Sequence, residues 1–174
     1  GGAVSAKSSL IIIASGTMSL LKNNEATGFY GGAIQLNEAS SLHVSGNNTR
    51  LLLDGNMAQD RGGGMCIQTA SSVYVSSGGF LGITNNTAKL LGGGIYSLNG
   101  GKLDISGVGT RVLVDGNTAT LGSGGGIFSF SAAVIIVSSG AHLDVTNNTA
   151  AIIDTIQELK NEGGGFCLLD ESYL

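Results

Sequence analysis

Two unrelated motifs recur along the whole chain with the same spacing, and this repetition limits the possible folds more than any other feature. A run of glycines followed by an apolar residue opens each unit, and the runs begin 30, 31, 30, 32 and 39 residues apart. An asparagine followed two residues later by alanine closes each unit, at intervals of 32, 30, 31 and 31 residues. Internal repeats of this length are typical of solenoids, propellers and arrays. The runs begin at Gly1, Gly31, Gly62, Gly92, Gly124 and Gly163, and the asparagines are Asn24, Asn56, Asn86, Asn117 and Asn148.

Each unit contains three short segments in which apolar and polar residues alternate, the pattern of half-buried strands. In one unit these segments follow Gly94, precede Ser106 and precede Asn117. Three strands and three turns in about 30 residues make one triangular coil, and stacking buries the apolar face that a lone coil leaves open. The sequence therefore predicts an all-β fold, a right-handed parallel β-helix of about five triangular coils.

Composition agrees with a packed solenoid and argues against several functional classes. The chain has no proline, as expected where nearly every strand is central, because proline removes a ladder hydrogen bond. Its hydrophobic content of 42% is too high for a disordered glycine-rich linker. The net charge of −4 and the lack of a basic stripe argue against a nucleic-acid partner. No apolar run approaches the ~20 residues of a membrane-spanning helix, so we expect no membrane span in this segment.

The repeats run into both ends of the chain. We therefore expect residues 1–174 to form a single β-helix segment, a fragment of a longer solenoid. One stretch, residues 150–162, interrupts the period, and Ile152, Ile156 and Leu159 within it lie at helical spacing. We expect a loop or short-helix insertion there, which is either a tolerated surface loop or a binding surface.

Residues that occupy equivalent positions in successive units would stack into columns. The five repeat asparagines (Asn24, Asn56, Asn86, Asn117 and Asn148) would form a ladder in which each side-chain amide bonds the next. The alanines that follow them would form a column of small residues at a tight corner. We interpret both columns as structural, and not as ligand-binding.

Three sequons of the form Asn-Asn-Thr make Asn47, Asn85 and Asn147 candidate N-glycosylation sites. An asparagine- and threonine-rich repeat can also produce such triplets by coincidence. If the second asparagine of Asn85-Asn86 points inward, then Asn85 points outward and can carry a glycan.

The outward positions of the first strand are unusually apolar for a surface. Exposed apolar stripes commonly mark partner surfaces, so this column is a candidate interface with another chain. The alternative is that a flanking loop covers it. The two cysteines of the column lie three units apart, about 14 Å at the spacing of stacked strands, which is too far for a disulfide between them. An intermolecular disulfide is the alternative to two separate thiols. The candidate interface consists of Cys66, Tyr96, Phe128 and Cys167.

A finer alternation links every second unit. Arg50 and Arg111 precede the third strand in the units that end Asp-Gly-Asn, and the units between them lack the arginine. The two arginines therefore share a column, as do Asp54 and Asp115. These charges are either weak surface ion pairs or a site for an anionic ligand.

No pattern in the sequence points to catalysis. Polysaccharide-cleaving β-helices need clustered carboxylates in an open groove. The outward column of the second strand does not gather acids: it reads Ile12, His43, Tyr74, Asp104 and Ile136. His43 and His142 fall on different strands, and neither a metal-binding spacing nor a phosphate loop is present. We therefore expect no catalytic residues, no metal site, no cofactor and no enzymatic activity.

The paired motifs resemble the repeats of chlamydial polymorphic membrane proteins, which alternate GGA[ILV] with FxxN. Residues 1–4 (GGAV) and 31–34 (GGAI) match the first motif, while later copies have a third glycine in place of alanine. The second motif carries an aliphatic residue in place of the family's phenylalanine in every copy, for example Leu53 before Asn56. The resemblance covers essentially the whole chain and implies a β-helix similar to autotransporter passengers, which are secreted surface proteins, typically adhesins, without a cofactor.

The expected function is a non-enzymatic extracellular structural or adhesive β-solenoid: a stalk, fibre or surface-adhesin segment. The expected location is extracellular or on the cell surface. The expected partners are other protein chains, through self-association or a surface receptor, and glycans. The alternative is a polysaccharide-binding or polysaccharide-cleaving β-helix protein, which clustered acids on one face would favour.

Overall fold

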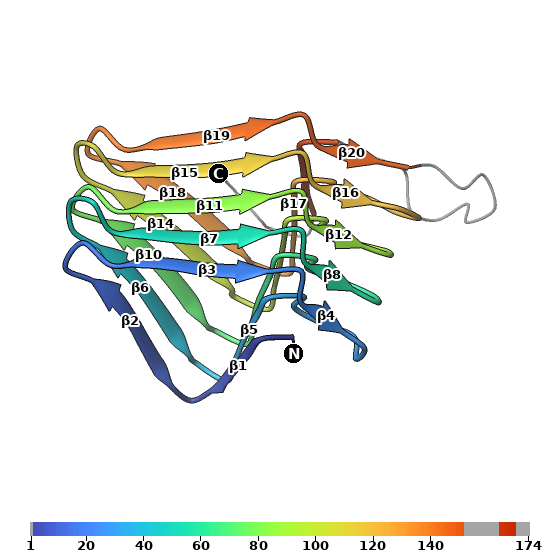
Figure 1. Ribbon diagram of the computed structural model, residues 1–174. Helices are drawn as coiled ribbons and strands as arrows, with labels where there is room; N and C mark the ends of the chain where they lie inside the picture. The colour runs from blue at the N-terminus through green and yellow to red at the C-terminus, as the bar shows by residue number, and fades with distance from the viewer. Residues whose placement is uncertain (1, 152–163, 170–174) are drawn as a thin grey trace.

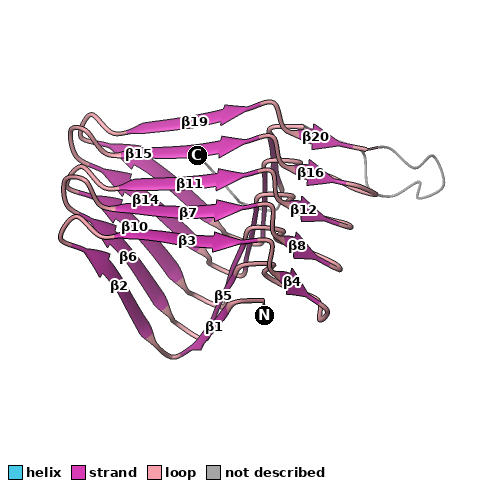
Figure 2. Cartoon of the chain, viewed as in Figure 1, coloured by secondary structure: helices cyan, strands magenta, loops and turns pink. Residues whose placement is uncertain are grey.

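The computed structural model describes residues 2–151 and 164–169, and this part of the chain folds as a parallel β-solenoid of about five coils (Figure 1). Each coil contributes one strand to each of four parallel sheets that run the length of the stack. Short loops join the strands, and the described part contains no helix (Figure 2). Accordingly, none of the described residues form a helix of the length and hydropathy needed to cross a membrane.

The three main sheets hold strands of three to five residues. The first sheet comprises β1 (Val4–Lys7), β5 (Ile34–Asn37), β9 (Met65–Gln68), β13 (Ile95–Leu98), β17 (Ile127–Phe130) and β21 (Phe166–Leu168). The second comprises β2 (Leu10–Ala14), β6 (Ser41–Ser45), β10 (Ser72–Ser76), β14 (Lys102–Ser106) and β18 (Val134–Ser138). The third comprises β3 (Met18–Lys22), β7 (Arg50–Asp54), β11 (Phe80–Thr84), β15 (Arg111–Asp115) and β19 (His142–Thr146).

A fourth sheet of two-residue strands was not predicted. It arises because the two residues after each repeat asparagine also pair with their equivalents above and below. Its strands are β4 (Glu25–Ala26), β8 (Met57–Ala58), β12 (Thr87–Ala88), β16 (Thr118–Ala119) and β20 (Thr149–Ala150). The predicted column of alanines lies here, and Ala58, Ala88 and Ala119 are buried.

Strand register follows the sequence repeat without a slip. Leu51 of β7 pairs with Leu81 of β11, which pairs in turn with Val112 of β15, so each residue lies beside its equivalent in the next coil. Because side chains alternate between the two faces of a strand, one set of columns points inward along the whole stack. The predicted parallel β-helix is confirmed.

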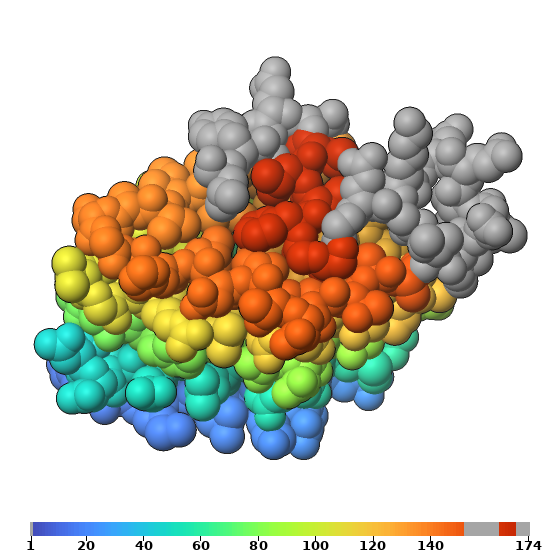
Figure 3. All heavy atoms as spheres, turned by 90° about the horizontal axis from the view of Figure 1, so that it is seen from above, coloured from blue at the N-terminus to red at the C-terminus, as the bar shows by residue number. Residues whose placement is uncertain are grey.

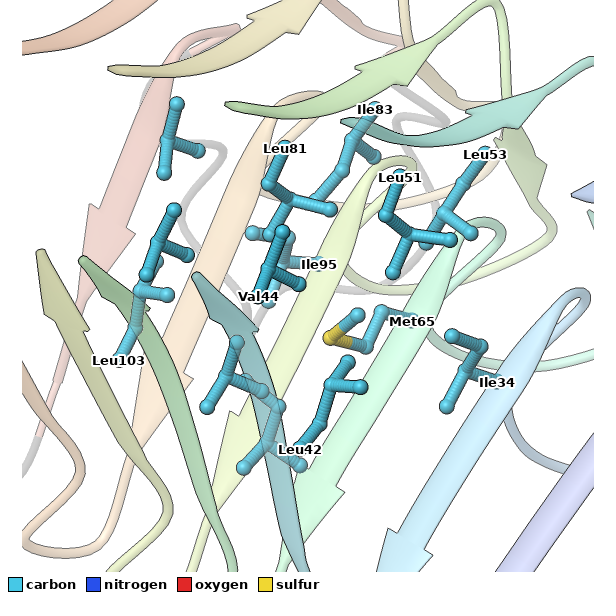
Figure 4. Close-up of a cluster of buried hydrophobic side chains, with 14 of the residues drawn as sticks. Ile34, Leu42, Val44, Leu51, Leu53, Met65, Leu81, Ile83, Ile95 and Leu103 are labelled. Carbon is cyan, nitrogen blue, oxygen red and sulfur yellow. The ribbon is translucent and has the colours of Figure 1, made fainter. Parts of the chain in front are cut away.

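The inward columns form one continuous apolar core (Figure 4). Leu42, Leu81 and Ile95, from three different sheets, are each at most 1% exposed. Burying a side chain of this size contributes roughly 1.5–3 kcal/mol. Inward residues of the last coil are less covered: Val137 is 41% exposed, whereas Val75 in the same column is fully buried. Figure 3 views the stack from this end.

The glycine runs occupy the most crowded corner of the coil. Gly62 has a φ of +66°, which favours glycine. At Gly63 an added Cβ would overlap the carbonyl oxygen of Gly93 and lie 2.5 Å from the carbonyl carbon of Thr87. The first two glycines of a run therefore recur because neighbouring atoms approach too closely there for a side chain, whereas the third position accommodates alanine at Ala33.

The insertion expected at residues 150–162 lies mostly outside the described residues. Ala150 belongs to β20, so the regular coil continues at least to that residue.

Candidate functional site

The repeat asparagines form the predicted ladder. The Oδ1 of Asn86 accepts hydrogen bonds from the backbone N–H of Asn56 (2.8 Å) and from its Nδ2 (2.9 Å). The Nδ2 of Asn86 donates to the Oδ1 of Asn117 (3.0 Å) and to the carbonyl of Leu53 (2.9 Å). The same bonds connect Asn24 to Asn56 and Asn117 to Asn148. Both donors and both acceptor positions of a buried amide are thus satisfied, so the ladder's role is structural.

The stripe expected to be an open interface is buried within the chain itself. The side chains of Cys66, Tyr96, Phe128 and Cys167 are all at most 3% exposed. They form a second apolar cluster on the outer face of the first sheet, packed against Tyr30, Leu90, Leu91, Leu98, Phe130 and Leu169. The expectation of an exposed interface there is corrected, and the alternative, a flanking loop over this column, is the one observed: the loops that follow the fourth sheet fold back over this face. Burial raises the pKa of the Cys66 thiol to about 12, so the thiolate is disfavoured.

Arg61 connects these covering loops to the first sheet. Its guanidinium carbon lies 5.7 Å from the ring centroid of Tyr30 and 5.4 Å from that of Tyr96. Nη1 also lies 3.4 Å from both tyrosine hydroxyl oxygens, and Asp60 lies 3.5 Å from Nε. Sequence reasoning missed this cluster, although Tyr30, Arg61 and Leu91 share a register position immediately before the glycine runs.

The three candidate glycosylation asparagines are all exposed. Asn85 and Asn147 have φ values of 54° and 52°, and their Nδ2 atoms donate to Asp54 and Asp115 at 2.9 Å and 2.8 Å. Asn47 lies in the turn between β6 and β7. Outward orientation of Asn85 and Asn147 therefore agrees with the sequence interpretation, and whether any of the three carries a glycan stays a prediction.

The alternating charges lie on the outer face of the third sheet, where β7, β11 and β15 place Arg50, Phe80 and Arg111 side by side. The guanidinium of Arg50 lies 5.3 Å from the ring centroid of Phe80. The Nε of Arg111 donates to Asp144 at 2.6 Å. These three side chains line a polar hollow of about 610 Å³. The structure thus brings the two predicted arginines together around an aromatic ring that sequence reasoning had not connected with them.

The two predicted aspartates lie at the opposite ends of the same strands. Hydrogen bonds from Asn85 and Lys22 lower the pKa of Asp54, and those from Thr146 and Asn147 lower the pKa of Asp115. Lys22 also forms an ion pair with Asp54 at 3.0 Å. Both carboxylates therefore link coils and do not face the arginine hollow.

The outward column of the second sheet has the predicted register, but its polar residues pair with one another. The rings of His43 and Tyr74 lie 4.7 Å apart, and Lys102 forms an ion pair with Asp104 at 2.8 Å. Among residues 2–151 and 164–169 no group of three or more His, Cys, Asp or Glu side chains could hold a metal ion.

No protein-family model, curated protein or solved structure matches this chain. Any function proposed for it therefore rests on the arrangement of the described residues. That arrangement offers a continuous stacked scaffold, a loop-covered sheet face and a basic hollow.

Proposed function

We propose that this chain is a non-enzymatic segment of an extracellular structural or adhesive β-solenoid, acting as a stalk, fibre or surface-adhesin segment. The observation that carries the proposal is the unbroken asparagine ladder from Asn24 to Asn148. Four side-chain links in one column, the two central ones buried and the two outer ones part-buried, join all five coils in addition to the backbone hydrogen bonds. Such a stack transmits load along its axis and protects its backbone from proteases.

Features of the surface support a scaffold more than a catalyst. The described carboxylates with lowered pKa values, Asp54 and Asp115, bond to asparagine and threonine side chains of the next coil. These bonds hold coils together and leave the carboxylates committed to structure. The proposed partners are a surface receptor or further copies of the chain.

The location can be tested with antibodies against the folded chain, applied to intact and permeabilised cells of the source organism. Equal labelling of intact and permeabilised cells is expected for a surface protein. Labelling that requires permeabilisation would exclude the extracellular proposal. Mass spectrometry of peptides containing Asn47, Asn85 and Asn147, before and after enzymatic deglycosylation, checks the sequons on the same material.

The mechanical part can be tested by pulling the chain in a single-molecule force experiment between two reference domains. We expect the chain to unfold at higher force than the Asn86→Ala variant, because the variant lacks the central links of the ladder. Equal unfolding forces for the two chains would show that the asparagine ladder is not the source of the mechanical resistance. Incubation with a panel of polysaccharides addresses the alternative, since released oligosaccharides would contradict a non-enzymatic role.

A further inference from the structure

The arginine hollow exists because one turn is shorter than its neighbours. Four residues link β6 to β7 and four link β14 to β15, but only three link β10 to β11 between them. The middle coil is therefore recessed between two longer turns. Gly78 and Gly109 add no side chains to fill the space, and a hollow of about 610 Å³ remains across three successive coils. We call this the arginine notch.

The notch floor fixes the position of its cations. Gly82 has no side chain, so the Phe80 ring lies against the sheet: an added Cβ at Gly82 would be 3.0 Å from Phe80 Cε1. Arg50 extends over that ring and forms no ion pair with any described residue. Arg111 uses Nε to bond Asp144, which leaves its two Nη groups for a ligand. Two arginines two coils apart are separated by about 9.6 Å at the spacing of stacked strands.

The side wall of the notch suits hydroxyl groups. Asn47 and Asn48 line it and are exposed, and each amide offers both a donor and an acceptor. Two cations are too few for nucleic acid, whose affinity depends on neutralising many phosphates. A ligand that combines hydroxyl groups with oxyanions spaced along a chain matches the lining better.

We propose that the arginine notch binds an acidic oligosaccharide lying along the solenoid axis. Arg50 and Arg111 each bind a carboxylate or sulfate group, and the unmodified amides of Asn47 and Asn48 bind sugar hydroxyls, so a glycan attached to Asn47 would exclude this site. The guanidinium fork matches either oxyanion with paired N–H groups. This inference deepens the adhesive part of the proposed function by naming the ligand class, and it rests on that function only for the biological role of binding.

The test measures binding of fluorescently labelled oligosaccharides to the purified chain by fluorescence anisotropy. A heparin-derived hexasaccharide provides sulfates, a galacturonate hexasaccharide provides carboxylates, and a neutral dextran oligosaccharide provides neither. We expect binding of at least one acidic probe and none of the neutral one. The stronger acidic probe then identifies the oxyanion. Equal binding of all three probes, or of none, overturns the proposal.

Substitutions locate the site. Arg50→Gln and Arg111→Gln should each weaken binding of the acidic probe about tenfold, as expected for a lost charged hydrogen bond. Lys89→Gln is the matched control, because it removes one exposed positive charge from the loop after the fourth sheet, and it should leave binding unchanged. If Lys89→Gln weakens binding as much as Arg50→Gln does, binding depends on general charge attraction and not on the arginine notch. An oligoglutamate peptide that binds as tightly as the saccharide would overturn the sugar assignment.

Shape is tested separately from charge. One glycine inserted after Gly78 lengthens the middle turn to match its neighbours and should fill the notch, abolishing binding without changing net charge. Circular dichroism and thermal unfolding show whether this variant is folded; if it is not, the arginine variants decide the question. A folded insertion variant with unchanged affinity would place the ligand elsewhere. The failure of notch binding leaves surface location and rod stiffness untouched, so the two proposals fail separately.

Discussion

Replacing Asn86 by alanine should destabilise the solenoid far more than replacing any exposed asparagine. The substitution removes the four hydrogen bonds that the Asn86 side chain makes. The backbone N–H of Asn56 then loses its acceptor inside the protein, since Asn86 Oδ1 is its partner in the structure. The Nδ2 of Asn56, the carbonyl of Leu53 and the Oδ1 of Asn117 each lose one of their hydrogen bonds.

The magnitude follows from counting these groups. A buried donor left unsatisfied costs about 1–3 kcal/mol, and each further lost hydrogen bond costs roughly 1 kcal/mol. Asn86→Ala should therefore lower the free energy of unfolding by about 4–6 kcal/mol. Asn24→Ala at the end of the ladder removes a single side-chain bond, to Asn56, because the backbone N–H of Asn24 is retained. Its cost should be about 1 kcal/mol.

Urea unfolding followed by far-ultraviolet circular dichroism measures these free energies. Asn85→Gly is the matched control: it changes the adjacent asparagine, removes one exposed bond to Asp54, and places glycine where the next coils have Gly55 and Gly116. This control should cost no more than about 1 kcal/mol. If Asn86→Ala and Asn85→Gly destabilise equally, the ladder is not a principal source of stability and the reasoning fails.

Three further predictions concern charge, thiol reactivity and packing. Hydrogen bonds from Asn85 and Lys22 lower the pKa of Asp54 in the folded chain. The stability that ionised Asp54 contributes is therefore present above the unfolded pKa of 3.8 and is lost as the pH falls through the folded-state pKa. The melting temperature should thus fall more steeply below pH ~4 in the parent chain than in Asp54→Asn; parallel curves would contradict this. Buried Cys66 should resist iodoacetamide in the folded chain and react in urea, as peptide mass spectrometry can show, and rapid native labelling would refute its burial. Gly63→Ala should prevent normal folding by backbone overlap, whereas Gly28→Ala, with nothing within 4 Å of the added Cβ, should change the melting temperature little; equal effects would argue against the crowded corner.

The sequence alone predicts the coil, the register and the ladder because a solenoid converts sequence period into spatial contact. Once the period was known, Asn56 had to lie beside Asn86, and Tyr74 beside Asp104, without further information. The same logic placed the outward columns correctly. This placement used only contacts between residues at equivalent positions of successive repeats.

From the sequence, a covering loop was only the alternative to an open interface, and the covering residues were not identified, because they depend on contacts between residues at different positions of the repeat. Tyr30 and Arg61 pack over Tyr96, which belongs to a different segment of the coil. Nothing in the period tells which way a loop folds. The sequence therefore left open whether Tyr96 was an exposed interface residue or covered by a loop, and its aromatic character suits the covered position that the structure shows. The sequence placed Arg50 and Arg111 in one column as a candidate anion site, but it did not predict the recess between them. The shorter turn before Phe80 is visible in the sequence, but the recess forms only between the longer neighbouring turns.

The chemistry of this solenoid repeats every second coil, although its backbone repeats every coil. Asn85 donates to Asp54 in the coil below, and an added Cβ at Gly116 in the coil above would lie 2.9 Å from Asn85 Oδ1. Asn85 at this corner thus has aspartate below and glycine above, and a second asparagine coil directly above it would lose the bond to aspartate and bring a Cβ close to the Asn85 amide oxygen. The long turn and its arginine belong to the same coils as the aspartate, as Arg50 and Asp54 show. The alternation of asparagine coils with aspartate–glycine coils therefore also places an arginine notch at every second coil. A solenoid extended by whole pairs of coils would present basic notches about 9.6 Å apart along one face.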